Sequence, residues 1–409
     1  MAVEPSQKGA LLYAAETAGT GWAEVSTTYG TRLPIAGDVN AILAGCQQPK
    51  DPAQITTQYN NEGRRDALMP QTCEFDVPLW LAGHGSSCAT GAVSATSVPT
   101  FLGLCLGGSN AGQTGGTVNA GTSAVQFSLT AAVGVAGALF RLGALGDGAG
   151  GGEWYCWSNP ATATILNAAA GTPSAGAVVY GAETVYCNET LSTVSSMRFN
   201  ALTANQRVGI WGAYCSGVTI EGTNTGELPK ATPHLIASAW DEESASVWPC
   251  VTAQDSFVPS PCTAGRLWIN TVGTSTRAVR SVRDVKIQIN VETYPIMAYD
   301  SLRQYQTIIG CVRGASTPII SWTEDAEAAG TQSLADIYDA TSLKHIMFSM
   351  STADGSAMGF YLPNAKCITP RPVQNAVDGL NRVSVSFQGM SGPTATTELT
   401  HSAWRLGFA

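Results

Sequence analysis

The sequence predicts a mainly β protein, and three observations support this fold class. Several segments alternate apolar and polar residues with a period of two, the pattern of a strand with one buried and one wet face. Glycine is abundant (44 residues) and charged residues make up only 12%, a composition of strands and turns. Helix signals are confined to two short segments. We therefore expect sandwich-like sheets with short flanking helices.

The clearest alternation lies between residues 285 and 292. Its aliphatic set is Val285, Ile287, Ile289 and Val291, and its polar set is Lys286, Gln288, Asn290 and Glu292. The same period recurs around residues 125–129, 346–350 and 383–387. Each segment is predicted to be a strand with its aliphatic residues in the core and its polar residues in water.

Two hairpins are predicted from turn residues between strand segments. Asp354-Gly355 separates the segments 346–350 and 358–362, and this dipeptide is a strong hairpin signal. The glycine-bounded segment 222–226 joins a strand at 211–221 to one at 231–240.

Two short helices are expected. Residues 99–106 begin with Pro99 and are followed by Gly107 and Gly108, which suits proline in the first turn and glycine after the last. Residues 333–340 form the second candidate, with Ser333 as the N-cap.

The length of 409 residues exceeds what one hydrophobic core usually supports, about 250–300 residues. We expect a first β-rich unit at 1–240 that carries a Gly/Ala-rich insertion at about 109–177. A proline-containing linker at 241–265 and a second β-rich unit at 266–409 follow. A diverged duplication is compatible with this division, although the two parts do not align convincingly.

The net charge of −9 argues against a module that grips phosphates, which needs clustered Lys and Arg. The densest basic spot is Arg64-Arg65. So few charges also predict that neighbouring subunits cover much of the surface.

No export or membrane segment is predicted. The apolar run 10–15 follows Glu4 and Lys8 and is cut by Glu16, which does not fit a signal peptide. The most apolar stretch, 131–140, is shorter than the ~20 residues of a membrane helix. Synthesis in a reducing cytoplasm is the expectation.

The eleven cysteines are isolated, without CxxC or zinc-ligand spacing. We expect reduced, buried thiols, with Cys250 and Cys262 as the one pair that could bridge. No metal is expected.

Motifs with possible chemistry have simpler interpretations. Residues 146–151 match GxGxxG, but the strand-like run 153–157 follows where a dinucleotide site needs a helix. There is no phosphate loop, so the sequence does not support nucleotide hydrolysis. No GxSxG nucleophile elbow is present, so nothing selects His84 or another histidine for a catalytic triad.

The four histidines, His84, His234, His345 and His401, are expected in turns or on the surface. The acidic stretches 241–243 and 324–327 lack an EF-hand pattern and are expected to be solvated loops. We therefore predict no enzyme activity and no cofactor.

The ten tryptophans have two interpretations. They can belong to the core or to interfaces, where Trp is enriched. The same residues would serve a carbohydrate-stacking platform, so a carbohydrate-binding or carbohydrate-degrading β protein is one alternative function.

Three segments in order resemble the major tail tube protein family of long-tailed, siphovirus-type bacteriophages. The first, 209–229, is similar to the family's glycine-led strand followed by a G-E-x-P turn, here Gly226-Glu-Leu-Pro229. The second, 99–108, resembles the short helix after the family's opening strands. The third comprises 358–365, 378–380 and 383–387, similar to its "x-f-x-l-p-n-a" and closing strands. The resemblance runs from about Leu33 to the C-terminus, except for 109–177.

This resemblance implies a structural virion protein that closes with its own copies into rings with an inner β-barrel. The rings would stack around a tape measure protein, between tail terminator and distal tail proteins, in a tail assembled in the host cytoplasm. DNA would pass through the lumen for genome ejection without specific binding. Three copies of a two-unit chain, with pseudo-sixfold symmetry, are favoured over a hexamer. A capsid decoration or distal tail protein is the nearest alternative.

Overall fold

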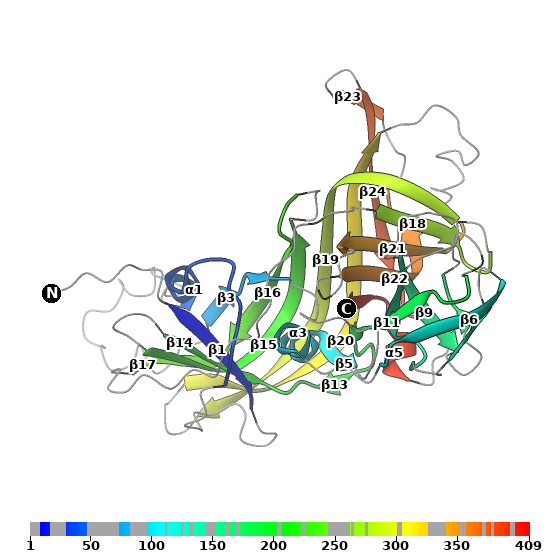
Figure 1. Cartoon of the computed structure of the whole chain (residues 1–409). Coiled ribbons are helices and arrows are strands. Elements are labelled where there is room, and N and C mark those ends of the chain that lie inside the picture. The colour runs from blue at the N-terminus through cyan, green and yellow to red at the C-terminus, as the bar shows by residue number, and fades with distance from the viewer. Residues whose placement is uncertain are drawn as a thin grey trace, which may run out of the picture.

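Figure 1 shows the computed structural model of the chain. The protein is mainly β, as predicted, with antiparallel sheets and few helices. The structure describes residues 9–16, 30–46, 73–81, 96–110, 113–123, 126–130, 134–143, 153–159, 164–167, 172, 174–202, 207–222, 226–243, 262, 266–274, 277–300, 305–325, 341–351, 355, 357–369, 374–377, 380–392 and 397–409.

Most of the strands belong to one large sheet, and six form a separate closed barrel. The described helices are α1 (Val39–Cys46), α3 (Ser97–Leu106) and α5 (Glu398–His401). The large sheet contains β1 (Ala10–Ala15), β2 (Thr31–Arg32), β3 (Cys73–Asp76), β4 (Leu79–Trp80), β5 (Gly107–Asn110), β12 (Glu183–Cys187), β13 (Ser192–Thr193), β14 (Met197–Leu202), β15 (Arg207–Glu221), β16 (Lys230–Ala237), β17 (Ala239–Glu243), β18 (Arg266–Thr271), β19 (Arg277–Asp300), β20 (Tyr305–Asp325), β21 (Lys344–Ser351), β22 (Met358–Cys367), β23 (Gln374–Val377), β24 (Leu380–Gly389) and β25 (Arg405–Phe408). The barrel contains β6 (Gly116–Ser123), β7 (Gln126–Leu129), β8 (Leu139–Leu142), β9 (Glu153–Asn159), β10 (Thr164–Ile165) and β11 (Val178–Gly181).

Seven strands of the sheet lie side by side in the order β3-β16-β15-β19-β20-β24-β22, each antiparallel to the next. At their centre is the hairpin of β19, with 24 residues, and β20, with 21 residues. These two long strands run through the middle of the molecule in Figure 1.

The main core covers one face of this sheet. Tyr13 of β1, Phe101 of α3 and Phe199 of β14 pack in a chain, with ring centroids 4.8 Å and 5.9 Å apart. Its cluster of buried side chains extends from Leu11 to Phe408, so both predicted units contribute to one core. Of the predicted linker 241–265, the structure describes only the last three residues of β17 and Cys262, so duplication stays a prediction.

The Gly/Ala-rich segment contains most of a small closed barrel, in the order β10-β7-β6-β11-β8-β9. The strand predicted near 125–129 and the strand-like run 153–157 are β7 and β9, whereas the other strands and the closure of the barrel were not predicted in a segment expected only as an insertion. A separate core fills the barrel, with Phe140 and Trp157 stacked at 4.0 Å. Strand β6 consists mostly of small and hydroxyl residues, so its local alternation is weak.

The barrel packs on the sheet through a third cluster of buried residues. Leu139 and Trp154 of the barrel meet Trp268, Met347 and Tyr361 of β18, β21 and β22. The Trp154 ring lies against Gly359 and Gly407, where an added Cβ would come within 2.6 Å of ring atoms. The absence of side chains on these two glycines therefore allows the close approach.

One predicted helix and both predicted hairpins are confirmed by the structure. The helix at 99–106 is confirmed as α3, with Thr96 as N-cap and Gly107 as C-cap. Both hairpins are confirmed, as β21–β22 and β15–β16. The strand predicted at 231–240 is divided at Ser238 into β16 and the start of β17. The helix at 333–340 and the motif 146–151 lie outside the described residues. The sequence did not predict α1 and α5.

Candidate functional site: a polar sheet face with apolar ends

The outer face of the seven-stranded sheet is polar along its centre, and β19 sets the pattern. Ile287 and Ile289 are buried at 0% and 1% exposure, whereas Lys286, Gln288, Asn290 and Glu292 are exposed. The predicted alternation is thereby confirmed. Its physical cause is that successive strand residues point to opposite faces, one packed on the core.

Neighbouring strands continue this polar face with hydroxyl groups. Thr219 of β15 lies opposite Gln288 of β19. Ser321 of β20 and Ser386 of β24 share a hydrogen bond of 2.8 Å between their Oγ atoms. Hydroxyl groups of the neighbouring strands therefore extend the polar face beyond β19.

Two lysines near the turn end of the β15–β16 hairpin are paired with one carboxylate. Glu221 lies 3.5 Å from Lys230 Nζ and 4.0 Å from Lys286 Nζ. All three side chains are substantially exposed, so these ion pairs add little stability. They do place a negative charge between the two cations, which weakens the attraction of this part of the face for a phosphate.

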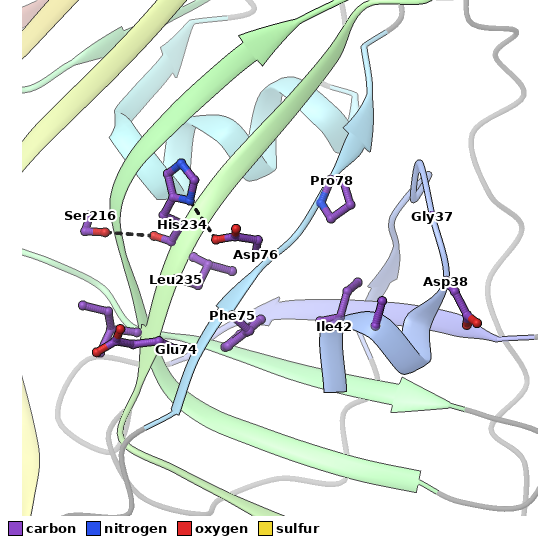
Figure 2. A pocket seen from close by; sticks show the side chains of 12 residues that line it. Gly37, Asp38, Ile42, Glu74, Phe75, Asp76, Pro78, Ser216, His234 and Leu235 are labelled. Carbon is purple, nitrogen blue, oxygen red and sulfur yellow. Dashed lines mark hydrogen bonds and ion pairs between the residues drawn. The ribbon is translucent and has the colours of Figure 1, made fainter. Parts of the chain in front are cut away.

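An open pocket of about 600 Å³ lies at the β3 edge of the sheet (Figure 2). It is lined by the start of α1, by β3 and by His234 of β16. His234 Nδ1 and Asp76 Oδ1 are 2.7 Å apart, and the other ring nitrogen lies 3.1 Å from Thr219 Oγ1. Figure 2 shows the imidazole beside the Asp76 carboxylate.

The Asp76–His234–Thr219 row resembles a base held next to a hydroxyl nucleophile. Acyl transfer also needs hydrogen-bond donors for an oxyanion. Thr219 lies in mid-strand, where β15 pairs with β16 on one side and β19 on the other, so the backbone groups there are occupied by the ladder. The row is better explained as polar pairing on an exposed sheet face. Asp76 and His234 are 158 residues apart, so no sequence spacing could have identified it.

Two polar predictions were wrong because the strands extend further into the core than the sequence indicated. His345 was expected in a turn or on the surface, but β21 is covered on both faces, by the main core and by the barrel. Its Nδ1 lies 2.9 Å from the Tyr361 hydroxyl, and burial lowers the pKa of His345 to about 4. Glu324 was expected in a solvated loop, but it is a buried residue of β20 with Arg280 Nε 3.5 Å away.

The cysteine prediction is confirmed for the thiols that the structure describes. Burial raises the pKa of Cys156 to about 11 and, with the charge of Glu189, that of Cys187 to about 12. Cys262 is buried, and Cys250 lies outside the described residues. The buried thiols are Cys73, Cys105, Cys156, Cys187, Cys215, Cys262, Cys311 and Cys367.

The described tryptophans favour the core over a stacking platform. Trp154, Trp157, Trp322 and Trp404 are among the largest fully buried side chains, and Trp211 and Trp268 are buried as well. These six rings are unavailable to a carbohydrate in this structure. His84 and Trp248 lie outside the described residues.

Exposed apolar side chains occur near both ends of the long strand β19. Near one end they are Tyr294, Ile296 and Met297, with Ile309 of β20; near the other end is Val279, and Val272 and Leu343 lie at the adjoining ends of β18 and β21. The polar face described above lies between them.

No protein-family model matches the chain, and no curated protein has a significant sequence match to it. Within the described residues, no group of three or more His, Cys, Asp and Glu side chains could hold a metal ion. No helix of that part of the chain is long and apolar enough to cross a bilayer.

Proposed function

We propose that this protein is a structural virion subunit that assembles with its own copies into stacked rings, forming the tail tube of a long-tailed bacteriophage. The observation that carries the proposal is the broad antiparallel sheet with one face on the core and a polar face exposed. Closing such sheets from several copies into one barrel would remove the exposed strand edges and surround a water-filled lumen.

The three segments behind the family resemblance lie around the same sheet. The glycine-led strand and its turn are β15 and β16, and the "x-f-x-l-p-n-a" strand and closing strand are β22 and β24. The short helix α3 packs on the core side, where Arg313 of β20 donates to the carbonyl oxygens of Leu104 and Cys105 at 3.2 Å and 2.8 Å. The proximity of these three segments supports the interpretation that they form one functional unit.

In this role the protein's partners are its own copies, the tape measure protein and the terminator and distal tail proteins, and its place is the virion tail. A capsid decoration protein would also bind its own copies. It would form small oligomers rather than open-ended tubes.

Purified protein is expected to form rings or tubes visible by negative-stain electron microscopy. The mass of isolated rings then distinguishes three chains with pseudo-sixfold symmetry, the expected result, from six. A six-chain ring would refute the trimer while leaving the tube intact. A protein that stays monomeric at high concentration would contradict the proposed function itself.

Duplex DNA is expected to show no measurable affinity for the assembled protein at physiological salt. Phosphate-driven binding requires accessible cations, and Lys230 and Lys286 of the polar face lie beside Glu221. Fluorescence anisotropy with labelled duplex, in a salt titration, measures this directly. Micromolar affinity that weakens with salt would instead favour a DNA-gripping connector.

A further inference from the structure

Two buried thiols meet where the helix α3 packs on the strand β15 (Figure 1). Cys105 lies in the last turn of α3, and Cys215 belongs to β15. Both side chains are at 0% exposure, and their thiols hydrogen-bond each other. The two residues are about 110 positions apart in the sequence, so only the fold brings them together.

A buried arginine lies beside this pair. Arg313 of β20 is 4% exposed, and its Nη2 donates to the carbonyl oxygen of Cys105 at 2.8 Å. Within the part of the chain that the structure describes, Arg313 forms no ion pair with a carboxylate, and its buried Nε has no hydrogen-bond partner. A buried charge without a counter-ion is costly, and a neighbouring acid that ionises lowers the cost. The charge of Arg313 favours the thiolate form of both Cys105 and Cys215.

The two thiols of the pair are not equivalent. Burial raises the pKa of Cys105 well above its usual value. Burial acts on Cys215 in the same direction, but the hydrogen bond from Cys105, hydrogen bonds with the backbone and the charge of Arg313 together lower the pKa of Cys215. Cys215 is therefore the thiolate of the pair, and Cys105 is the thiol that donates to it. A thiolate beside a cation is the nucleophilic form of cysteine, and a second thiol next to it can resolve its oxidised state.

We propose that Cys105 and Cys215 form a redox site, at which a hydroperoxide converts the two thiols into a disulfide that joins α3 to β15. The Cys215 sulfur attacks the peroxide, the O–O bond breaks, and a sulfenic acid forms while the leaving hydroxide takes up a proton to become water. The Cys105 sulfur then attacks the Cys215 sulfur, so that the S–S bond forms, the S–O bond breaks and the hydroxide leaves with the Cys105 proton as a second water. The two thiols lose two electrons, and these reduce one hydrogen peroxide to two waters. A dithiol reductant reverses the step by thiol–disulfide exchange.

This inference goes beyond the proposed function and does not depend on it, because the pair lies within one copy of the chain. The disulfide closes a loop of about 110 residues, and cross-links that close long loops restrict the unfolded chain most. Oxidation is therefore expected to stabilise the fold.

The test uses the purified, folded chain treated with hydrogen peroxide. Remaining thiols are alkylated, and the protein is digested without reduction and analysed by mass spectrometry. A peptide pair linked through Cys105 and Cys215 is expected, and it disappears after treatment with dithiothreitol. The midpoint of thermal unfolding is expected to rise by about 5 °C on oxidation. The control Cys367→Ser, which removes a thiol that donates to Thr369 O instead, is expected to keep the link.

Two serine variants test the separate roles of the thiols, and a serine hydroxyl can still donate a hydrogen bond in place of either thiol. In Cys105→Ser, peroxide is expected to leave Cys215 as a sulfenic acid that dimedone traps. In Cys215→Ser, dimedone is expected to leave Cys105 unlabelled. Labelling of Cys105 in that variant would overturn the assignment of the nucleophile. Absence of the linked peptide pair from the oxidised parent chain, or a link from either cysteine to a different thiol, would overturn the redox site itself.

Discussion

Replacing Ile287 with aspartate is expected to eliminate soluble folded protein, whereas Gln288→Asp at the next position is expected to leave the yield near that of the parent chain. Ile287 lies in a row of three isoleucines that crosses the sheet, between Ile220 of β15 and Ile320 of β20. All three side chains are fully buried. A carboxylate in this position has no water and no charged partner supplied by the row.

The expected penalty for Ile287→Asp is several kcal/mol, because a buried unpaired charge loses its hydration. Domains are stable by only about 5–15 kcal/mol, so the loss approaches the whole stability of the fold. The side chain of Gln288 points to the exposed face, so a carboxylate at this position stays in water. Soluble yield and thermal unfolding of both variants measure the contrast. Equal loss in both would refute the assignment of the two faces.

Trp154→Ala is expected to destabilise the protein by about 3–5 kcal/mol, as removal of a buried tryptophan usually does. The ring lies between the small barrel and the main sheet, at 1% exposure, and contacts the positions of Gly359 and Gly407. The barrel is therefore expected to loosen from the sheet first, so that denaturant unfolding broadens or separates into two steps.

Chemical unfolding followed by circular dichroism measures the loss, with Trp80→Ala as a matched control. Trp80 of β4 is only partly buried, so the same truncation there is expected to cost less. Gly407→Ala tests the same contact from the side of the main sheet, because Gly407 of β25 lies against the Trp154 ring. Its methyl group would overlap Trp154 Cζ3, at 2.6 Å, and is expected to cost about 1–3 kcal/mol. Losses for Trp154→Ala no larger than for Trp80→Ala would show that the barrel is held by other contacts.

Local features of the fold could be predicted from the chain alone. The alternation in β19, the hairpins β15–β16 and β21–β22, and the helix α3 each depend on residues within one short segment. Glycines at the turns show why: Gly222 and Gly355 adopt φ values of 73° and 75°, which few other residues tolerate. Side-chain period and backbone sterics act over a few residues, so their outcome can be predicted from sequence.

The sequence by itself therefore determined the fold class, the wet and buried faces of the central strands and the buried state of the described thiols. The closure of the barrel, the burial of His345 and Glu324, the Asp76–His234 pair and the exposed apolar side chains near the ends of β19 depended on tertiary structure. Each of these features joins segments far apart in the chain or depends on which strands cover a face. Such pairings are selected by the burial of the whole core, and a local pattern does not encode which distant segment provides it.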